Sequence, residues 1–236
     1  MLKSKLRLPI KGAGFAVLVA FIYSLAGTIT IPIFPIFIEN LVGNPAYTGY
    51  FMSLIYLMVL VYILLSNYFL KKFDKMTILK FSVLGSGISF LILTVINSIV
   101  QLLILELFRT LFIALNFVVM GLLIRDGSTK NTISRNEGYY FAIINVSFFI
   151  GPIIGGLLAD AYSFSKVFLL ASLFPLAVFM LLLGKKKEVK IKMSEVRLFE
   201  SMKEYLNNKN LMINYIIACG LLSWLVILYI YIPLYM

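Results

Sequence analysis

Seven long apolar runs divide the chain, and short polar or basic segments separate them. A bilayer core of about 30 Å is crossed by about 20 helical residues, so each run predicts one membrane-spanning helix. The first run is too long for a cleavable signal peptide, and Pro32 and Pro35 stand where the cleavage site would lie. The predicted spans cover residues 14–38, 47–70, 77–99, 101–124, 139–159, 164–184 and 211–235.

Basic residues gather in alternate loops between these spans. All of the 21 Lys and Arg residues except Arg109 and Lys166 lie near the N-terminus or around the loops after the second, fourth and sixth spans. Loops rich in Lys and Arg stay on the cytoplasmic side of a membrane, which predicts a cytoplasmic N-terminus and an external Met236. The net charge of +11 is therefore a topology signal, and nucleic acid is not an expected partner.

The overall composition agrees with a multi-pass protein of the cell membrane. Hydrophobic residues make up 61% of the chain and charged residues 13%, whereas soluble domains have about 45–50% and about 25%. The chain has no histidine and a single cysteine, Cys219, which excludes a disulfide framework, His-based catalysis and zinc sites with His or Cys ligands. We expect no enzyme activity, no metal and no cofactor. A retinal-based pump is excluded too, because residues 211–236 contain no lysine for its attachment.

The order of the spans predicts three parts. Residues 1–184 form a six-helix bundle, residues 185–210 a cytoplasmic linker with a short amphipathic helix, and residues 211–236 a seventh span. The first and seventh spans end alike: residues 29–34 read ITIPIF, and residues 230–235 read IYIPLY. Parallel six-helix repeats are a known plan of transporters, so the seventh span is interpreted as the start of a second bundle that stops early. Chance similarity between two Ile-rich and Tyr-rich segments is the alternative.

The fifth span carries a strip of small side chains. Ser147, Gly151, Gly155 and Ala159 recur every four residues and so share one helix face, and Pro152 interrupts the backbone hydrogen bonding beside it. Small residues allow a second helix to approach closely within a membrane. The strip predicts a tight helix contact, without indicating which helix is the partner.

This strip resembles a motif of the major facilitator superfamily, and specifically of its twelve-helix drug:proton antiporters. The antiporter motif g-x-x-x-G-P-x-x-G-G aligns with residues 147–156 and ends at Gly156, with Ser147 in place of the first glycine. The first-helix motif of the same group, l-G-x-x-x-x-x-P-v-x-P, is matched with alanine in place of glycine by Leu25, Ala26, Pro32 and Pro35. The resemblance implies an all-α fold in which a six-helix bundle forms half of a transporter.

Two further motifs of that family are only partly matched. In the inner-loop motif G-x-L-a-D-r-f-G-r-k, Lys71 replaces the aspartate and Asp74 the second glycine, while Lys72 and Lys75 keep the basic character. The family's charge relay through that aspartate is therefore in doubt here, and the lysines could simply hold the loop at the membrane surface. Of the fourth-span motif R-x-x-q-G, only Arg109 remains.

Arg109 is also a candidate without the resemblance, because ionisable residues inside a span are costly and often functional. Glu106 precedes it by three residues, so the two side chains share a face and can pair. Asn116 continues the same face. We expect these three residues to line a substrate or proton pathway, although a self-neutralising structural pair is an equally simple interpretation. Tyr23 and Asn145 are further pathway candidates, or else hydrogen-bond partners between helices.

The sequence thus predicts a secondary active transporter that works by alternating access. The resemblance implies proton-coupled efflux of small drug-like or metabolite molecules, with uptake as the nearest variant. An alternative is a truncated or split half-transporter that functions only after pairing with a second six-helix half or with another copy of itself.

Overall fold

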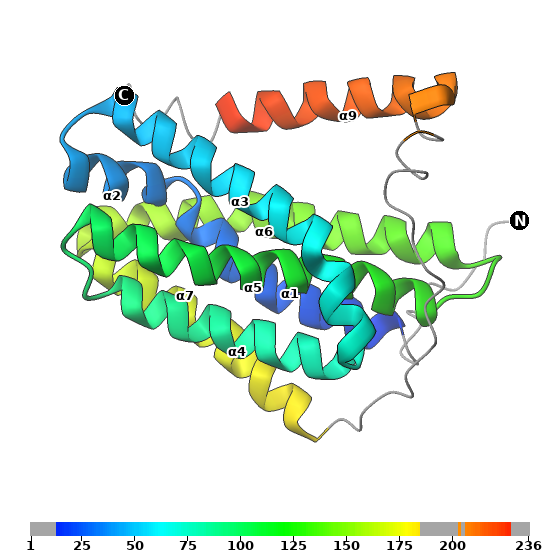
Figure 1. Ribbon diagram of the computed structural model, residues 1–236. Coiled ribbons are helices and arrows are strands. Elements are labelled where there is room, and N and C mark those ends of the chain that lie inside the picture. The colour runs from blue at the N-terminus through cyan, green and yellow to red at the C-terminus, as the bar shows by residue number, and fades with distance from the viewer. Residues whose placement is uncertain (1–12, 185–202, 204–205, 228–236) are drawn as a thin grey trace, which may run out of the picture.

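The computed structural model of the protein is a bundle of helices that lie side by side, and it describes residues 13–184, 203 and 206–227 (Figure 1). No strand occurs among these described residues. The helices are α1 (Ala13–Thr30), α2 (Ile33–Val42), α3 (Pro45–Lys72), α4 (Lys75–Leu93), α5 (Ile99–Asp126), α6 (Ile133–Ala161), α7 (Phe164–Leu183) and α9 (Lys209–Val226).

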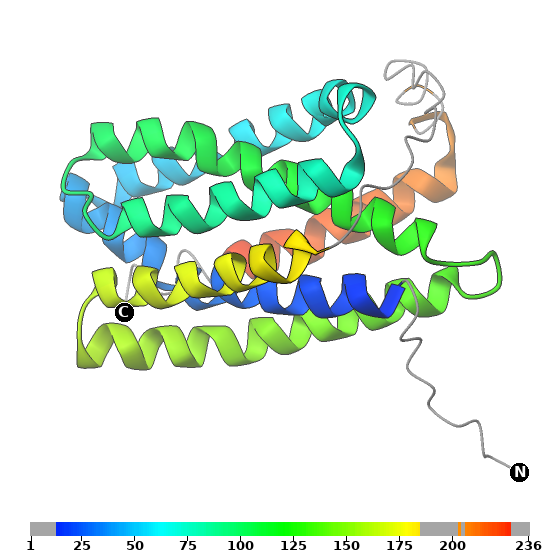
Figure 2. The same cartoon turned by 90° about the horizontal axis from the view of Figure 1, so that it is seen from below.

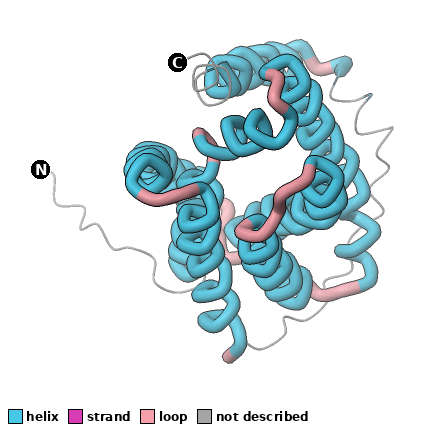
Figure 3. Tube along the Cα trace, turned by 90° about the vertical axis from the view of Figure 1, so that its left-hand side faces the viewer, coloured by secondary structure: helices cyan, strands magenta, loops and turns pink. Residues whose placement is uncertain are grey.

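Successive long helices run in opposite directions, so the α3–α4 and α5–α6 loops meet at one end of the bundle (Figure 1). We call this the basic end, since Lys71, Lys72, Lys75, Arg125 and Arg135 lie there. Helix α1 lies between α6 and α7, α4 packs against α5 and α7, and α3 packs against α5. The view in Figure 2 shows α1 beside α6, and Figure 3 shows the bundle nearly end-on.

Polar capping residues determine where several helices begin. The side chains of Asn44, Asp74 and Ser98 accept hydrogen bonds from the backbone N–H groups of the first turns of α3, α4 and α5. Such caps satisfy donors that a helix cannot satisfy internally. The predicted third span was wrong at its end: α4 stops at Leu93, and Ile99 already belongs to α5 because Ser98 caps it.

The first predicted span is divided in two. Helices α1 and α2 together are apolar and long enough to cross a membrane, but they are bent by 41° at the break between them. Pro32, which precedes α2, lacks a backbone N–H and disfavours helical geometry in the residue before it. Pro35 lies in the first turn of α2, where a missing N–H is tolerated. The predicted first span is therefore a bent pair of helices rather than one straight helix.

Apolar side chains cover the outside of the bundle as well as its interior. Phe149 is 75% exposed and Tyr50 73%, whereas Ile29 and Phe168 are fully buried between helices. Five of the described helices can cross a membrane by length and composition, or six if α1 and α2 count as one span. A helix that is apolar on all sides suits lipid contact outside and helix contact inside. The predicted all-α membrane fold is confirmed.

The last predicted parts are only partly described. Helix α9 overlaps the predicted seventh span and runs along the outside of the bundle, with most of its described side chains exposed (Figure 1). Residues 185–202 and 228–236, which include the linker's basic run and the end of that span, lie outside the described residues. The amphipathic helix expected in the linker therefore stays a prediction.

Candidate functional site

A buried ion pair lies on α5, where the sequence spacing indicated it. The Arg109 Nε donates to Glu106 Oε1 at 2.6 Å, and its Nη2 donates to Glu106 Oε2 at 2.9 Å. Glu106 is fully buried and Arg109 is 8% exposed. Two parallel hydrogen bonds of this kind give a planar, oriented contact that satisfies both charges.

Aromatic rings enclose the guanidinium of this pair. The Arg109 Cζ lies 4.7 Å from the ring centroid of Phe34 on α2 and 5.8 Å from that of Phe90 on α4. Cation–π attraction is stronger where water is excluded, as it is here. The Thr110 hydroxyl donates to the Glu106 carbonyl on the adjacent turn. The pair thus connects α5 to α2 and α4.

A cavity of about 200 Å³ lies between α1, α5 and α6, and we call it the central cavity. Its walls are mainly apolar, with Ile113, Phe117 and Ile144 among them. No residue that is charged at neutral pH is among the described residues that line it. Its polar lining comes from Tyr23, Ser24, Thr28, Asn116 and Tyr140.

Most of these polar groups already have hydrogen-bond partners. The Tyr23 hydroxyl lies 2.9 Å from the Ser86 hydroxyl on α4, and the Ser24 hydroxyl donates to Ser147 Oγ on α6 at 2.7 Å. Asn116 differs, because its Nδ2 is buried and has no hydrogen-bond partner. A buried donor without a partner costs free energy, so this amide weakens the packing of α5 at this place.

The predicted polar face of α5 therefore separates into two places. Glu106 and Asn116 are ten residues apart, which is about 15 Å along a helix. The ion pair lies toward α2 and α4, whereas Asn116 and Tyr23 meet at the central cavity. Asn145 is exposed, donates its Nδ2 to the Phe141 carbonyl at 2.9 Å, and is not among the residues that line the cavity.

The small-residue strip of α6 packs against α1. A Cβ atom added at Gly151 would lie 2.6 Å from Thr28 Cβ, and one added at Gly155 would lie 3.0 Å from the carbonyl carbon of Ile29. Both distances are well below an ordinary carbon contact of about 3.5–4.0 Å. Gly156 is exposed, and an added Cβ there would meet nothing within 4 Å. The strip therefore holds α6 against one wall of the central cavity.

Charged residues connect the helices at the basic end. Asp74 caps α4, and Lys75 forms an ion pair with Asp126 at the end of α5. Lys71 and Lys72 are exposed. The sequence analysis did not identify Asp126 as a partner of Lys75. The signal that could have identified it is the position of an acidic residue at the end of a span, on the side where the loops are basic.

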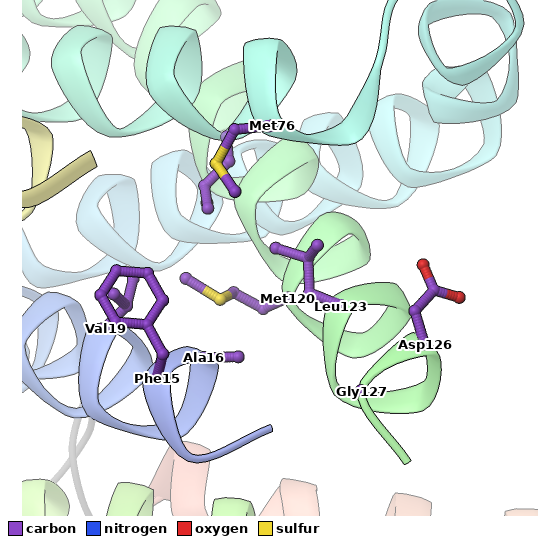
Figure 4. Close-up of a pocket in the computed structure, with 9 residues that line it drawn as sticks. Phe15, Ala16, Val19, Met76, Met120, Leu123, Asp126 and Gly127 are labelled. Carbon is purple, nitrogen blue, oxygen red and sulfur yellow. The ribbon is translucent and has the colours of Figure 1, made fainter. Parts of the chain in front are cut away.

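A second cavity of about 150 Å³ opens at the basic end (Figure 4). Phe15 and Val19 of α1, Met76 of α4 and Leu123 of α5 form its apolar walls, and Asp126 lies at its edge. Met120 lines this cavity and the central cavity alike. Its flexible side chain therefore lies between the two spaces.

Neither cavity resembles a metal centre. No group of three or more His, Cys, Asp or Glu side chains that could hold a metal ion occurs among the described residues.

A sequence model described as Major Facilitator Superfamily matches residues 16–236 of the chain. No curated protein matches the chain.

Proposed function

The chain belongs to the major facilitator superfamily, and we propose that it exports small drug-like or metabolite molecules by alternating access, in exchange for protons. Members of this family are transporters rather than enzymes, so the chain is a transporter of the major facilitator type. The observation that carries the proposal is the central cavity between α1, α5 and α6, midway along the bundle. A mainly apolar cavity with a few oriented polar groups suits a small amphipathic ligand.

Glu106 is the proposed proton carrier. It is fully buried within α5, and among the described acids it lies farthest from any helix end. Its partner Arg109 would have to move away before Glu106 could take up a proton. Because Phe34 of the bent α2 covers the guanidinium, a shift of α2 would expose the pair. Proton exchange would thus accompany a rearrangement at the end of the bundle opposite the basic end.

The proposed setting is the plasma membrane, with the N-terminus in the cytoplasm. The Lys and Arg residues at the basic end support this orientation by the positive-inside rule. The bilayer, a small-molecule substrate and protons are then the partners.

The second candidate function is a half-transporter that works only when a second six-helix half or another copy of the chain pairs with it. It is favoured by the low burial of α3 and α6, in each of which 17% of an apolar stretch of 18 residues is buried, against 61% in α4. In a rocking mechanism two bundles enclose the substrate between them. Cross-linking of the purified chain in lipid vesicles, with and without a candidate second bundle, separates the two candidates. A stable pair that alone supports transport would favour the second.

Proton coupling is tested in proteoliposomes with an imposed pH gradient. Three naphthalene probes with one ring system serve as substrates: neutral 1-naphthylacetamide, cationic (1-naphthylmethyl)trimethylammonium and anionic 1-naphthylmethanesulfonate. At least one probe should accumulate under the gradient, and a proton ionophore should abolish the accumulation. Glu106→Gln should lose the gradient dependence, whereas Asp160→Asn, at the exposed end of α6, should retain it. Full gradient-driven transport by Glu106→Gln would remove Glu106 from the coupling.

A further inference from the structure

Helix α1 lacks a side chain at one point of the wall that it contributes to the central cavity. Gly27 is the one glycine among the described residues that line this cavity, and a Cβ atom added to it would meet nothing within 4 Å. Tyr23, one turn earlier on α1, and Ile31, just after the end of α1, line the cavity as well. The missing side chain therefore leaves open space between two larger ones.

In the described part of the chain, nothing in the packing requires a glycine at this position. The glycine with positive φ is Gly43, so Gly27 has a helical geometry that any residue adopts. No neighbouring helix lies as close to Gly27 as α1 lies to Gly155, where an added Cβ would overlap the Ile29 carbonyl oxygen. Glycine inside a helix is less stable than alanine. What the absence of a side chain provides here is space in the cavity.

The size of the cavity makes this space decisive for the ligand. An enclosed apolar cavity of about 150 Å³ holds a single benzene ring, and the central cavity has about 200 Å³. Whether a second ring fits therefore depends on a volume of only a few atoms. The other walls include Phe117 of α5 and Ile144 and Phe148 of α6. Aromatic rings pack well against such side chains in offset or edge-to-face arrangements.

We propose that Gly27 sets the size limit of the central cavity, which takes flat two-ring aromatic molecules that lie against the α1 backbone. This inference rests on the proposed function, since it names the substrate class of the same site. Selection depends on shape and apolar contact, and it requires neither a hydrogen bond nor a charge on the ligand. Added bulk at residue 27 should therefore discriminate between ligands by size.

Binding of two uncharged probes with the same amide group tests this size limit. They are 1-naphthylacetamide, with two rings, and phenylacetamide, with one. Equilibrium dialysis of the purified chain in lipid nanodiscs measures both affinities, with empty nanodiscs as the blank for partition into lipid. The parent chain should bind 1-naphthylacetamide about tenfold more tightly, because the second ring adds four carbon atoms of apolar surface.

Substitutions at residue 27 should change the two affinities unequally. Gly27→Val adds a stiff branched side chain and should weaken 1-naphthylacetamide binding about tenfold or more, but phenylacetamide binding less than about twofold. Gly27→Ala adds one carbon atom and should weaken 1-naphthylacetamide binding about threefold. Small side chains at this position thus lower the affinity without abolishing binding.

The matched control is Gly121, which lies within α5 and outside the cavity lining, and which also has nothing within 4 Å of an added Cβ. Gly121→Val should leave both affinities unchanged. Gly27→Ala and Gly121→Ala should both unfold at or above the Tm of the parent chain, because alanine favours the helix. A loss of binding in a variant of undiminished Tm cannot be attributed to misfolding.

The ratio of the two affinities decides the result, and Gly27→Ala provides it if Gly27→Val does not fold. Selective loss of 1-naphthylacetamide would support the inference. An equal loss of both probes, unchanged binding of 1-naphthylacetamide, or a parent chain that binds neither probe would overturn it.

Failure of the two proposals can be told apart. Size-selective binding that depends on residue 27, with no gradient-driven transport of any probe, would support the inference and contradict the transport function. Gradient-driven transport by the parent chain, with the same affinity ratio in Gly27→Val, would do the reverse.

Discussion

Gly155→Ala should destabilise the bundle far more than Gly156→Ala, although the two glycines are adjacent on α6. At Gly155 a new Cβ would lie 3.0 Å from the carbonyl carbon of Ile29 and 3.1 Å from Ile33 Cδ1, and it would overlap the Ile29 carbonyl oxygen. At Gly156 nothing lies within 4 Å. Relief at Gly155 requires α1 and α6 to separate by more than about 1 Å, because the Ile29 carbonyl oxygen is the atom that the new Cβ overlaps most.

The difference between the two variants isolates the contact energy. Replacing glycine with alanine inside a helix is favourable by about 1 kcal/mol wherever space allows, and this gain applies equally to both positions. Overpacking a well-packed contact costs about 1–3 kcal/mol. The backbone of Ile29 cannot yield as a flexible side chain would, because α1 is held between α6 and α7. We therefore expect Gly155→Ala to be about 1–3 kcal/mol less stable than Gly156→Ala.

Thermal unfolding in detergent, followed by far-ultraviolet circular dichroism, measures this difference. For a domain of 150–250 residues, 1 kcal/mol corresponds to about 2–4 °C in Tm, so the two variants should differ by several degrees. Gly156→Ala should unfold at or slightly above the Tm of the parent chain. Equal Tm values for the two variants would refute the close packing of α6 on Ile29.

Two further predictions concern the ion pair and the boundary between the cavities. Arg109→Met should lower the free energy of unfolding by about 3–5 kcal/mol, since it leaves a buried carboxylate unpaired, and the double variant with Glu106→Met should recover much of this loss. SDS-induced unfolding measures both variants, and a double variant that loses the sum of the two single losses would contradict the pairing. Met120→Trp should slow the access of 1-naphthylacetamide to the central cavity from the basic end several-fold, because Met120 lines both cavities, while the volume-conserving Met120→Leu should not. Stopped-flow fluorescence measures the binding rates, and equal rates for the two variants would show that access does not pass Met120.

The spans could be predicted from the sequence because a bilayer demands long apolar helices wherever the chain crosses it. The same reasoning found the Glu106–Arg109 contact, since residues three apart on a helix must share a face. It missed the break at Pro32, because hydropathy alone counts an interrupted span and a continuous one alike.

The candidate site was less predictable, because helical spacing specifies a face but not what the face contacts. The strip through Gly155 was visible in the sequence, yet its partner α1 was not. Likewise Glu106 and Asn116 share a stripe in the sequence, but about 15 Å of helix and different neighbours separate their surroundings. Asn145 illustrates the same limit, since its helix face is exposed in the structure.

The central claim is that the cavity between α1, α5 and α6 opens alternately to the two sides of the membrane. Gly27 lines this cavity and has room for a side chain, so Gly27→Cys in a Cys219→Ser background introduces a thiol there. The measurement is its reaction rate with a small membrane-impermeant methanethiosulfonate in right-side-out and inside-out vesicles. The account predicts reaction from both sides, slowed in each case by 1-naphthylacetamide, and no such protection of Gly121→Cys, which lies outside the cavity lining. Reaction from one side only, or from neither, would contradict alternating access through this cavity.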